Sequence, residues 1–100
     1  MTLLLLSTIL YSASFDCSKA TTTIEKTICK NNELGNLDTL LNDNYLLLKS
    51  SLKKDDFKAV KIRQRQWLKS LKSVCKNKSN IANCLIDEYK KRITELNLKS

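Results

Sequence analysis

The sequence contains no histidine and no proline, and it has one glycine and one tryptophan among 100 residues. Without histidine, the chain lacks the side chain that most often serves as a general base or a metal ligand. A single glycine cannot build a glycine-rich phosphate-binding loop. Without proline, no ring interrupts a helix from within. We therefore expect a non-enzymatic, helical protein with no catalytic residues, no cofactor and no metal site.

Acidic side chains are absent from residues 57–78, which contain eight basic residues. The remainder of the chain is nearly balanced, so this segment accounts for the net charge of +8. A patch of one sign attracts partners of opposite charge, although such patches are also often simply solvated. Anionic lipid, an envelope polymer and an acidic protein are the candidate partners. The candidate binding face consists of Lys61, Arg65, Lys69 and Lys72.

The same segment also has an apolar period of three and four residues, which is typical of a helix with one face in a core. The stripe consists of Phe57, Val60, Gln64, Trp67, Leu71 and Val74. Gln64 is the polar member, and a buried amide needs hydrogen-bond partners. We interpret it as a structural amide that holds a helix end or a loop backbone, with a ligand contact as the alternative. Trp67 is likewise interpreted as core in preference to a binding surface.

Residues 1–14 are uncharged and rich in leucine, and they end on the small residues Ser12, Ala13 and Ser14. This pattern predicts a signal peptide that is removed on export, leaving a domain of residues 15–100. A membrane anchor would need about 20 apolar residues, more than this run provides. We therefore expect a periplasmic or secreted protein that is not transmembrane after processing. Export also argues against a nucleic-acid partner for the basic face.

Four cysteines in an exported domain of this size indicate two disulfides. A zinc site is disfavoured because the sequence has no CxxC pair and no histidine. Of the three possible pairings, we favour Cys17 with Cys29 and Cys75 with Cys84. Each would close a short loop and contribute about 3 kcal/mol in the chain-entropy model. A pairing that ties the amino-terminal segment to the last two helices remains possible.

Three further segments complete the predicted helices. Thr22 and Glu25 have the spacing of a capping box, which predicts a helix of about two turns ending near Cys29. Residues 30–35 should then turn the chain, with Gly35 in a left-handed conformation. A helix over residues 37–53 and another over residues 82–98 follow. The inward positions of the last helix are Leu85, Tyr89, Ile93 and Leu96.

The helix predicted over residues 37–53 is apolar around much of its circumference. Its main stripe is Leu37, Leu41, Tyr45, Leu48 and Leu52, widened by Leu40, Leu46 and Leu47. We therefore expect it to be covered on more than one side. Asp55 or Asp56 should cap the next helix, because aspartate is a favoured cap. A short connection between two amphipathic helices predicts an antiparallel hairpin whose helices pack along each other. The predicted fold is thus all-α, with three main helices and a short leading one.

Several of these residues together resemble a family of small secreted bacterial proteins named after the lysozyme inhibitor LprI. The resemblance rests on FDCSKA at 15–20, Glu25 with Ile28 and Cys29, Leu34 with Leu37 and Asp38, Tyr45, QxxW at 64–67, Cys75, Cys84 with Leu85, and YxxRI at 89–93. It implies an exported, disulfide-bonded helical domain with Gln64, Trp67, Tyr45 and Tyr89 in its structural core. Many relatives have an Arg-Asp pair where this chain has Leu71 and Lys72.

For function, the resemblance implies binding of a protein partner, which for the founding member is host lysozyme. Our first hypothesis is therefore an exported, non-enzymatic binding protein that inhibits lysozyme. The alternative is a basic module that adsorbs to anionic lipid or an envelope polymer through the 57–78 face. A third hypothesis is an immunity-type partner for another secreted protein.

Overall fold

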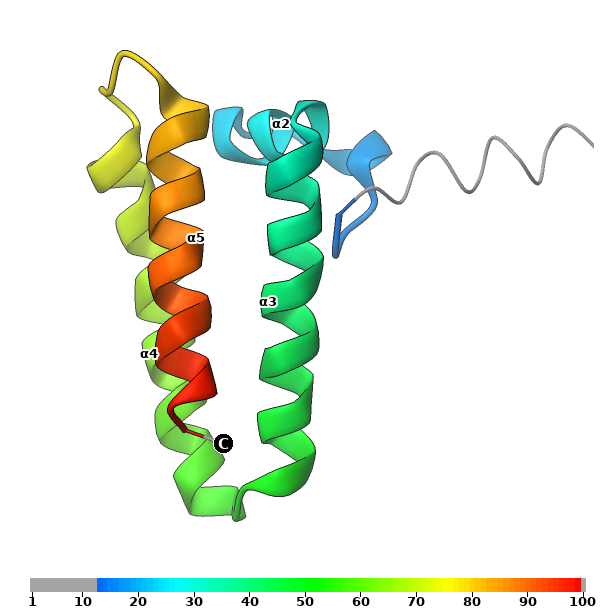
Figure 1. Cartoon of the computed structure of the whole chain (residues 1–100), viewed down its shortest axis with the longest axis vertical. Coiled ribbons are helices and arrows are strands. Elements are labelled where there is room, and N and C mark those ends of the chain that lie inside the picture. Colours follow the sequence, from blue (N-terminus) through cyan, green and yellow to red (C-terminus); the bar gives the residue numbers. More distant parts are fainter. Residues whose placement is uncertain (1–12, 100) are drawn as a thin grey trace, which may run out of the picture.

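The computed structural model describes residues 13–99, which form a short 3-10 turn and four α-helices without a strand (Figure 1). The elements are η1 (Cys17–Lys19), α2 (Thr23–Lys30), α3 (Asn32–Ser51), α4 (Lys54–Cys75) and α5 (Ile81–Asn97). The prediction of an all-α fold with three main helices and a short leading helix is confirmed. Between residues 13 and 99, no helix combines the length and hydropathy that crossing a membrane requires. Most of the predicted signal peptide lies outside the described residues.

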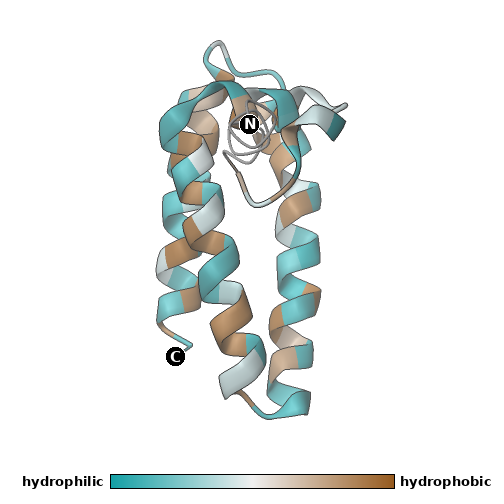
Figure 2. Ribbon diagram, turned by 90° about the vertical axis from the view of Figure 1, so that its right-hand side faces the viewer, coloured by the Kyte–Doolittle hydropathy of each residue, from teal (hydrophilic) through white to brown (hydrophobic). Residues whose placement is uncertain are grey.

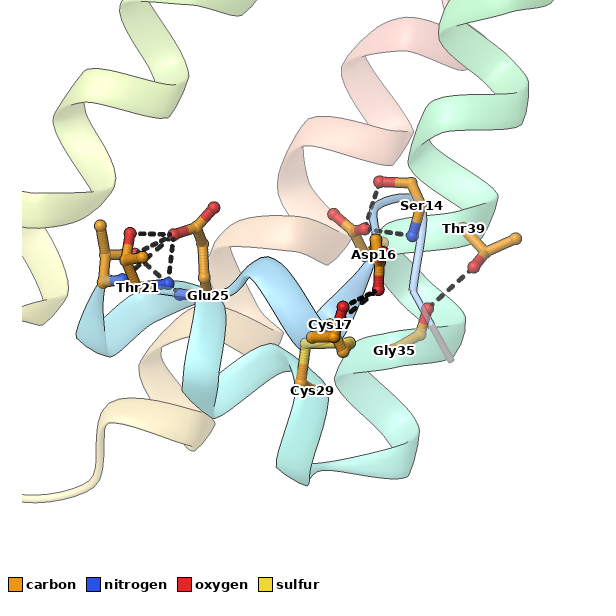
Figure 3. Close-up of a disulfide and its surroundings, with 11 residues drawn as sticks. Ser14, Asp16, Cys17, Thr21, Glu25, Cys29, Gly35 and Thr39 are labelled. Carbon is orange, nitrogen blue, oxygen red and sulfur yellow. Dashed lines mark hydrogen bonds between the residues drawn. A yellow bond between two sulfur atoms is a disulfide. The ribbon is translucent and has the colours of Figure 1, made fainter. Parts of the chain in front are cut away.

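The amino-terminal helix begins with the predicted capping box. Thr22 Oγ1 accepts a hydrogen bond from the Glu25 backbone N–H at 3.1 Å, and Glu25 Oε1 accepts one from the Thr22 backbone N–H at 3.1 Å (Figure 3). The backbone N–H of Thr21 also donates to Glu25 Oε1. These donors favour the ionised carboxylate and lower the pKa of Glu25 below its usual value. Two orphan donors at the helix start are thereby satisfied.

The long helix α3 begins about five residues earlier than the sequence pattern suggested, and the predicted turn over residues 30–35 is wrong. Asn31 is its cap, since the Asn31 side chain accepts a hydrogen bond from the Leu34 backbone N–H at 3.0 Å. Gly35 therefore lies inside the helix, where it is buried and has no positive φ. Gly35 lies near the amino-terminal segment at the start of α3 (Figure 3).

The three long helices run side by side, and α2 lies across one end of them (Figure 1). Helix α4 runs antiparallel to both α3 and α5. The predicted antiparallel connection between α3 and α4 is present, but the two helices do not pack closely along each other. Instead, α5 packs against both of them, and α3 and α4 touch directly at few positions. The last helix therefore completes the core, a role that the loop lengths alone did not reveal.

The connection into α4 also differs from the expectation. Lys53 occupies the cap position without a side-chain cap, and Asp55 and Asp56 fall in the first turn of the helix. Aspartates in a first turn still stabilise the helix, because their charge opposes the positive end of the helix dipole.

Hydrophobic and hydrophilic residues alternate along each long helix in the way that amphipathic helices require (Figure 2). The inward positions predicted for α5, Leu85, Tyr89, Ile93 and Leu96, are all buried. The wider apolar face predicted for α3 is wrong, since Leu40, Leu46 and Leu47 are exposed. Val74 is also exposed, and Cys75 takes its place in the core. A helix has 3.6 residues per turn, so a stripe of alternating threes and fours drifts across its face over several turns.

Both disulfides have the local pairing. Cys17 is bonded to Cys29, which joins η1 to α2, and Cys75 is bonded to Cys84, which joins the end of α4 to the first turn of α5. All four cysteines of the chain are thereby used. The first bond anchors the amino-terminal segment, and the second joins the end of one long helix to the start of the next.

Candidate functional site

A polar cluster lies in the core where the amino-terminal segment, α3 and α5 meet. Tyr89 Oη donates a hydrogen bond to Asp38 Oδ1 at 2.7 Å. The backbone N–H of Ser14 donates to Asp38 Oδ2 at 2.8 Å, and the Ser14 hydroxyl donates to the same oxygen (Figure 3). Asp38 is only 7% exposed and Tyr89 only 1%. Burial, followed by the negative charge of Asp38, raises the pKa of the Tyr89 hydroxyl well above its usual value.

A second polar contact links α5 to α4. Gln64 Oε1 accepts a hydrogen bond from Arg92 Nε at 2.7 Å, and Arg92 Nη1 reaches Glu95 Oε1 at 3.4 Å. Gln64 is half-buried and Arg92 is buried. The partner of Gln64 is therefore an arginine side chain, where we had expected a helix end or a loop backbone. Among residues 13–99, no buried side-chain nitrogen or oxygen lacks a hydrogen-bond partner.

Aromatic side chains pack around these contacts. Trp67 and Tyr89 pack edge to face, with their ring centroids 5.0 Å apart. The ring centroids of Tyr45 and Phe57 are 5.2 Å apart. Trp67 and Tyr45 are half-buried and pack against the buried core. The four residues predicted to belong to the structural core therefore lie at the contacts between α3, α4 and α5; they are Tyr45, Gln64, Trp67 and Tyr89. Gln64 and Tyr89 also form the hydrogen bonds that link these helices.

Asp38 and Arg92 are the buried charged residues of the described chain, and the reasoning from sequence did not predict their burial. A signal was present in both cases. Asp38 lies four residues after Leu34 and three before Leu41, and Arg92 lies three after Tyr89 and four before Leu96. Each charged side chain therefore falls on the apolar stripe of its own helix, a position that places it in the core.

A cavity of about 290 Å³ opens between α3 and α4 beside this cluster. Its wall on α3 includes Asn42 and Tyr45, its wall on α4 includes Lys61, Gln64 and Arg65, and Tyr89 reaches it from α5. Lys61 and Arg65 belong to the predicted binding face and are both exposed at this cavity. Lys69 and Lys72 are also exposed on α4, and Lys72 lines a second cavity, near the start of α2.

Helix α3 presents a surface of the opposite character. Leu40, Asp43 and Leu47 follow one another at spacings of three and four residues, so they share one exposed face of the helix. Leu40 is 47% exposed and Leu47 is 64% exposed. No basic residue occurs between Lys30 and Lys49. We call these three residues the α3 leucine face.

The fold and these surfaces define a small all-α domain that two local disulfides hold together. The chain belongs to the family Lysozyme inhibitor LprI, whose family model matches residues 16–96. Neither the curated proteins nor the solved structures that we compared with the chain gave a match. At the level of the family, membership implies a lysozyme-inhibitor type of function with a protein partner.

Proposed function

We propose that the protein is an exported, non-enzymatic inhibitor that binds lysozyme. The observation that carries this proposal is the family match over residues 16–96, which covers the helices of the described fold up to the penultimate residue of α5. Two disulfides support export, because such bonds persist in oxidising compartments. We further propose that residues 1–14 are the signal peptide, which mass measurement of the exported protein would test.

The α3 leucine face is the surface that we propose for the contact with lysozyme. Lysozymes of the c-type are basic proteins, so the lysine-rich surface of α4 would meet them with like charge. The α3 leucine face offers two exposed apolar side chains and the carboxylate of Asp43 on a helix without basic residues from Asn32 to Leu48. Exposed apolar side chains rimmed by polar residues are common at sites of protein association.

The net charge of +8 makes a kinetic prediction for this complex. Two basic proteins repel each other at long range, and salt screens this repulsion. The association rate with a basic lysozyme should therefore rise with ionic strength, which is the reverse of the usual behaviour of a steered complex.

The direct test is lysis of a cell-wall suspension by c-type lysozyme in the presence of the purified, oxidised protein. We expect near-stoichiometric inhibition, and we expect Leu40→Asn combined with Leu47→Asn to abolish it. Both leucines are exposed, so folding should survive the change. Absence of inhibition at a large molar excess of the wild-type protein would overturn the proposal. Full inhibition by the double variant would overturn the choice of surface.

A further inference from the structure

One flank of α4 bears a continuous row of cations. Their spacings are four, three, four, four, three and four residues, which confines them to an arc of roughly 80° at 100° per residue. All seven side chains are exposed. The members of this α4 cation row are Lys54, Lys58, Lys61, Arg65, Lys69, Lys72 and Lys76.

No carboxylate between residues 13 and 99 forms an ion pair with a member of the row. The ion pairs between residues 13 and 99 involve Lys90, Lys91 and Arg92, all on α5. Across the cavity, α3 presents the neutral side chains of Asn42 and Tyr45. The carboxylate of Asp38 also lines this cavity, but it is only 7% exposed, it accepts a hydrogen bond from Tyr89, and it forms no ion pair with the row. The charge of the row is therefore available to a partner.

Two cavities lie in succession along this flank, each bordered by two members of the row. Lys61 and Arg65 line the cavity of about 290 Å³, and Lys72 and Lys76 line one of about 360 Å³. From Arg65 to Lys72 the helix rises about 10 Å. Each cavity also offers neutral polar groups, which are Asn42, Tyr45 and Gln64 in the first and Thr22, Thr23 and Asn77 in the second.

We propose that the α4 cation row is a binding site for a linear, phosphate-bearing polymer that lies along α4. Phosphate groups would pair with the row, and the neutral polar groups of the cavities would contact the units between them. Six of the seven cations are lysines. Lysine is a common phosphate ligand that acts as a point charge, and the fork of arginine also matches a phosphate group. The row is about 33 Å long, which gives a flexible chain several contacts at once.

The fold favours a polymer over a lipid bilayer. A helix that lies on a membrane inserts an apolar face between the lipids. The apolar stripe of α4 packs into the core through Val60, Leu71 and Cys75. The exposed apolar side chains of α4, which are Ile62, Leu68 and Val74, are six residues apart and so lie on different sides of the helix, where they form no second apolar face. Cations that border cavities suit a narrow chain that can enter them, whereas a flat surface would reach only their rims.

The test is titration of the oxidised protein with a short inorganic polyphosphate at several salt concentrations. The row variant replaces Lys61, Arg65, Lys72 and Lys76 with glutamine. The control variant replaces Lys30, Arg63, Lys91 and Lys99 with glutamine, which removes the same number of lysines and arginines away from the row. Both variants lower the net charge by four, and all eight residues are exposed. Circular dichroism would check that each variant remains folded.

We expect the row variant to bind polyphosphate at least about tenfold more weakly than the control variant. Its plot of log K against log salt should be shallower by roughly 3, since each lost contact removes about 0.7 from the slope for a single strand. Replacing Lys61, Lys72 and Lys76 with arginine should preserve binding. Equal weakening in the row and control variants would overturn the site, because net charge alone would then explain the binding.

Two further titrations test the choice of ligand. Poly-aspartate of matched length should bind more weakly than polyphosphate, and equally tight binding would overturn the preference for phosphate. Vesicles of anionic lipid should also bind more weakly, and row-dependent binding as tight as that of polyphosphate would overturn the polymer. Lysozyme inhibition should be unchanged in the row variant, so this proposal and the proposed function can fail separately.

Discussion

Tyr89 on α5 and Asp38 on α3 are joined by a 2.7 Å hydrogen bond inside the core, although 51 residues separate them in the sequence. The amino-terminal segment also reaches this carboxylate, through Ser14. A buried carboxylate is costly unless hydrogen bonds satisfy it. On our proposal the Ser14 contact is lost when residues 1–14 are removed, so in the exported protein this acidic side chain joins α3 to α5 through Tyr89.

Replacing Tyr89 with phenylalanine tests this relation. The change keeps the ring that packs against Trp67 but removes one hydrogen-bond donor from Asp38. We expect the free energy of unfolding to fall by about 1–3 kcal/mol, the cost of an unsatisfied buried polar group. Urea denaturation would measure it. Tyr45→Phe is the matched control, because the Tyr45 hydroxyl has no hydrogen-bond partner among the described residues, and its effect should be small.

The same tyrosine should make the protein sensitive to alkali. Its pKa is raised by burial and by Asp38 in the folded state, so the folded state holds its proton longer than the unfolded chain does. This contribution to stability is complete below the ordinary tyrosine value of about 10, and it declines as the pH rises above that value. Unfolding free energies between about pH 9 and 11 should therefore fall more steeply for wild-type protein than for Tyr89→Phe. Equal slopes would contradict this prediction.

The Gln64–Arg92 contact predicts a cost for losing the amide. Gln64→Ala removes the acceptor of Arg92 Nε and should lower the free energy of unfolding by about 1–3 kcal/mol. Gln64→Glu supplies a carboxylate oxygen at the same place and should restore most of that stability. Gln66→Ala, at an exposed position on the same helix, is the control. A cost for Gln66→Ala as large as that for Gln64→Ala would show that the contact is not the cause.

Two adjacent leucines of α3 test which face of that helix enters the core. Leu48 is 1% exposed and Leu47 is 64% exposed. Truncation of a buried leucine to alanine costs about 2–5 kcal/mol, whereas exposed positions change stability by about 0.5 kcal/mol or less. We therefore expect Leu48→Ala to lower the melting temperature strongly and Leu47→Ala to leave it almost unchanged. Similar losses for both would mean that Leu47 is also covered.

The capping box gives a prediction for acid. Hydrogen bonds from Thr22 and Thr21 lower the pKa of Glu25 in the folded protein below the ordinary value of 4.5. The stability that depends on the ionised carboxylate is complete above that value and is lost as the pH falls through the lower, folded value. Acid titration followed by circular dichroism should show a shallower loss of stability for Glu25→Gln than for the wild type. Removing the cap with Thr22→Ala should lower stability at neutral pH by about 1 kcal/mol.

The sequence was sufficient to predict the helices, the capping box, the local disulfides and the inward face of α5. Each of these depends on residues close together in the chain, where spacing and capping chemistry act directly. The amino-terminal limit of α3 does not follow from the glycine, because Gly35 predicts a turn whereas the cap at Asn31 starts the helix before it. A buried glycine in a helix reflects what packs against it, and spacing along one chain does not contain that information.

The errors in α3 and in the candidate site share a cause. Leucines occur around most of α3, so their pattern could not tell Leu48 from Leu47. The partner of Asp38 comes from another helix, as does the partner of Gln64. The positively charged face of α4 was visible in the composition. Its division into a single row along two cavities required the positions of α2 and α3.

Because α5 packs against both α3 and α4, and those two helices scarcely touch, no smaller part of the chain contains a complete core. A chain emerging from a ribosome or a translocation channel would expose the leucines of α3 and the apolar stripe of α4 until residues 81–97 had followed. Such a chain lacks a complete core until α5 is present, so it should fold in one cooperative step at the end. On the export that we propose, the chain would cross a membrane before it acquires its disulfides, and this order of events would prevent folding before the crossing.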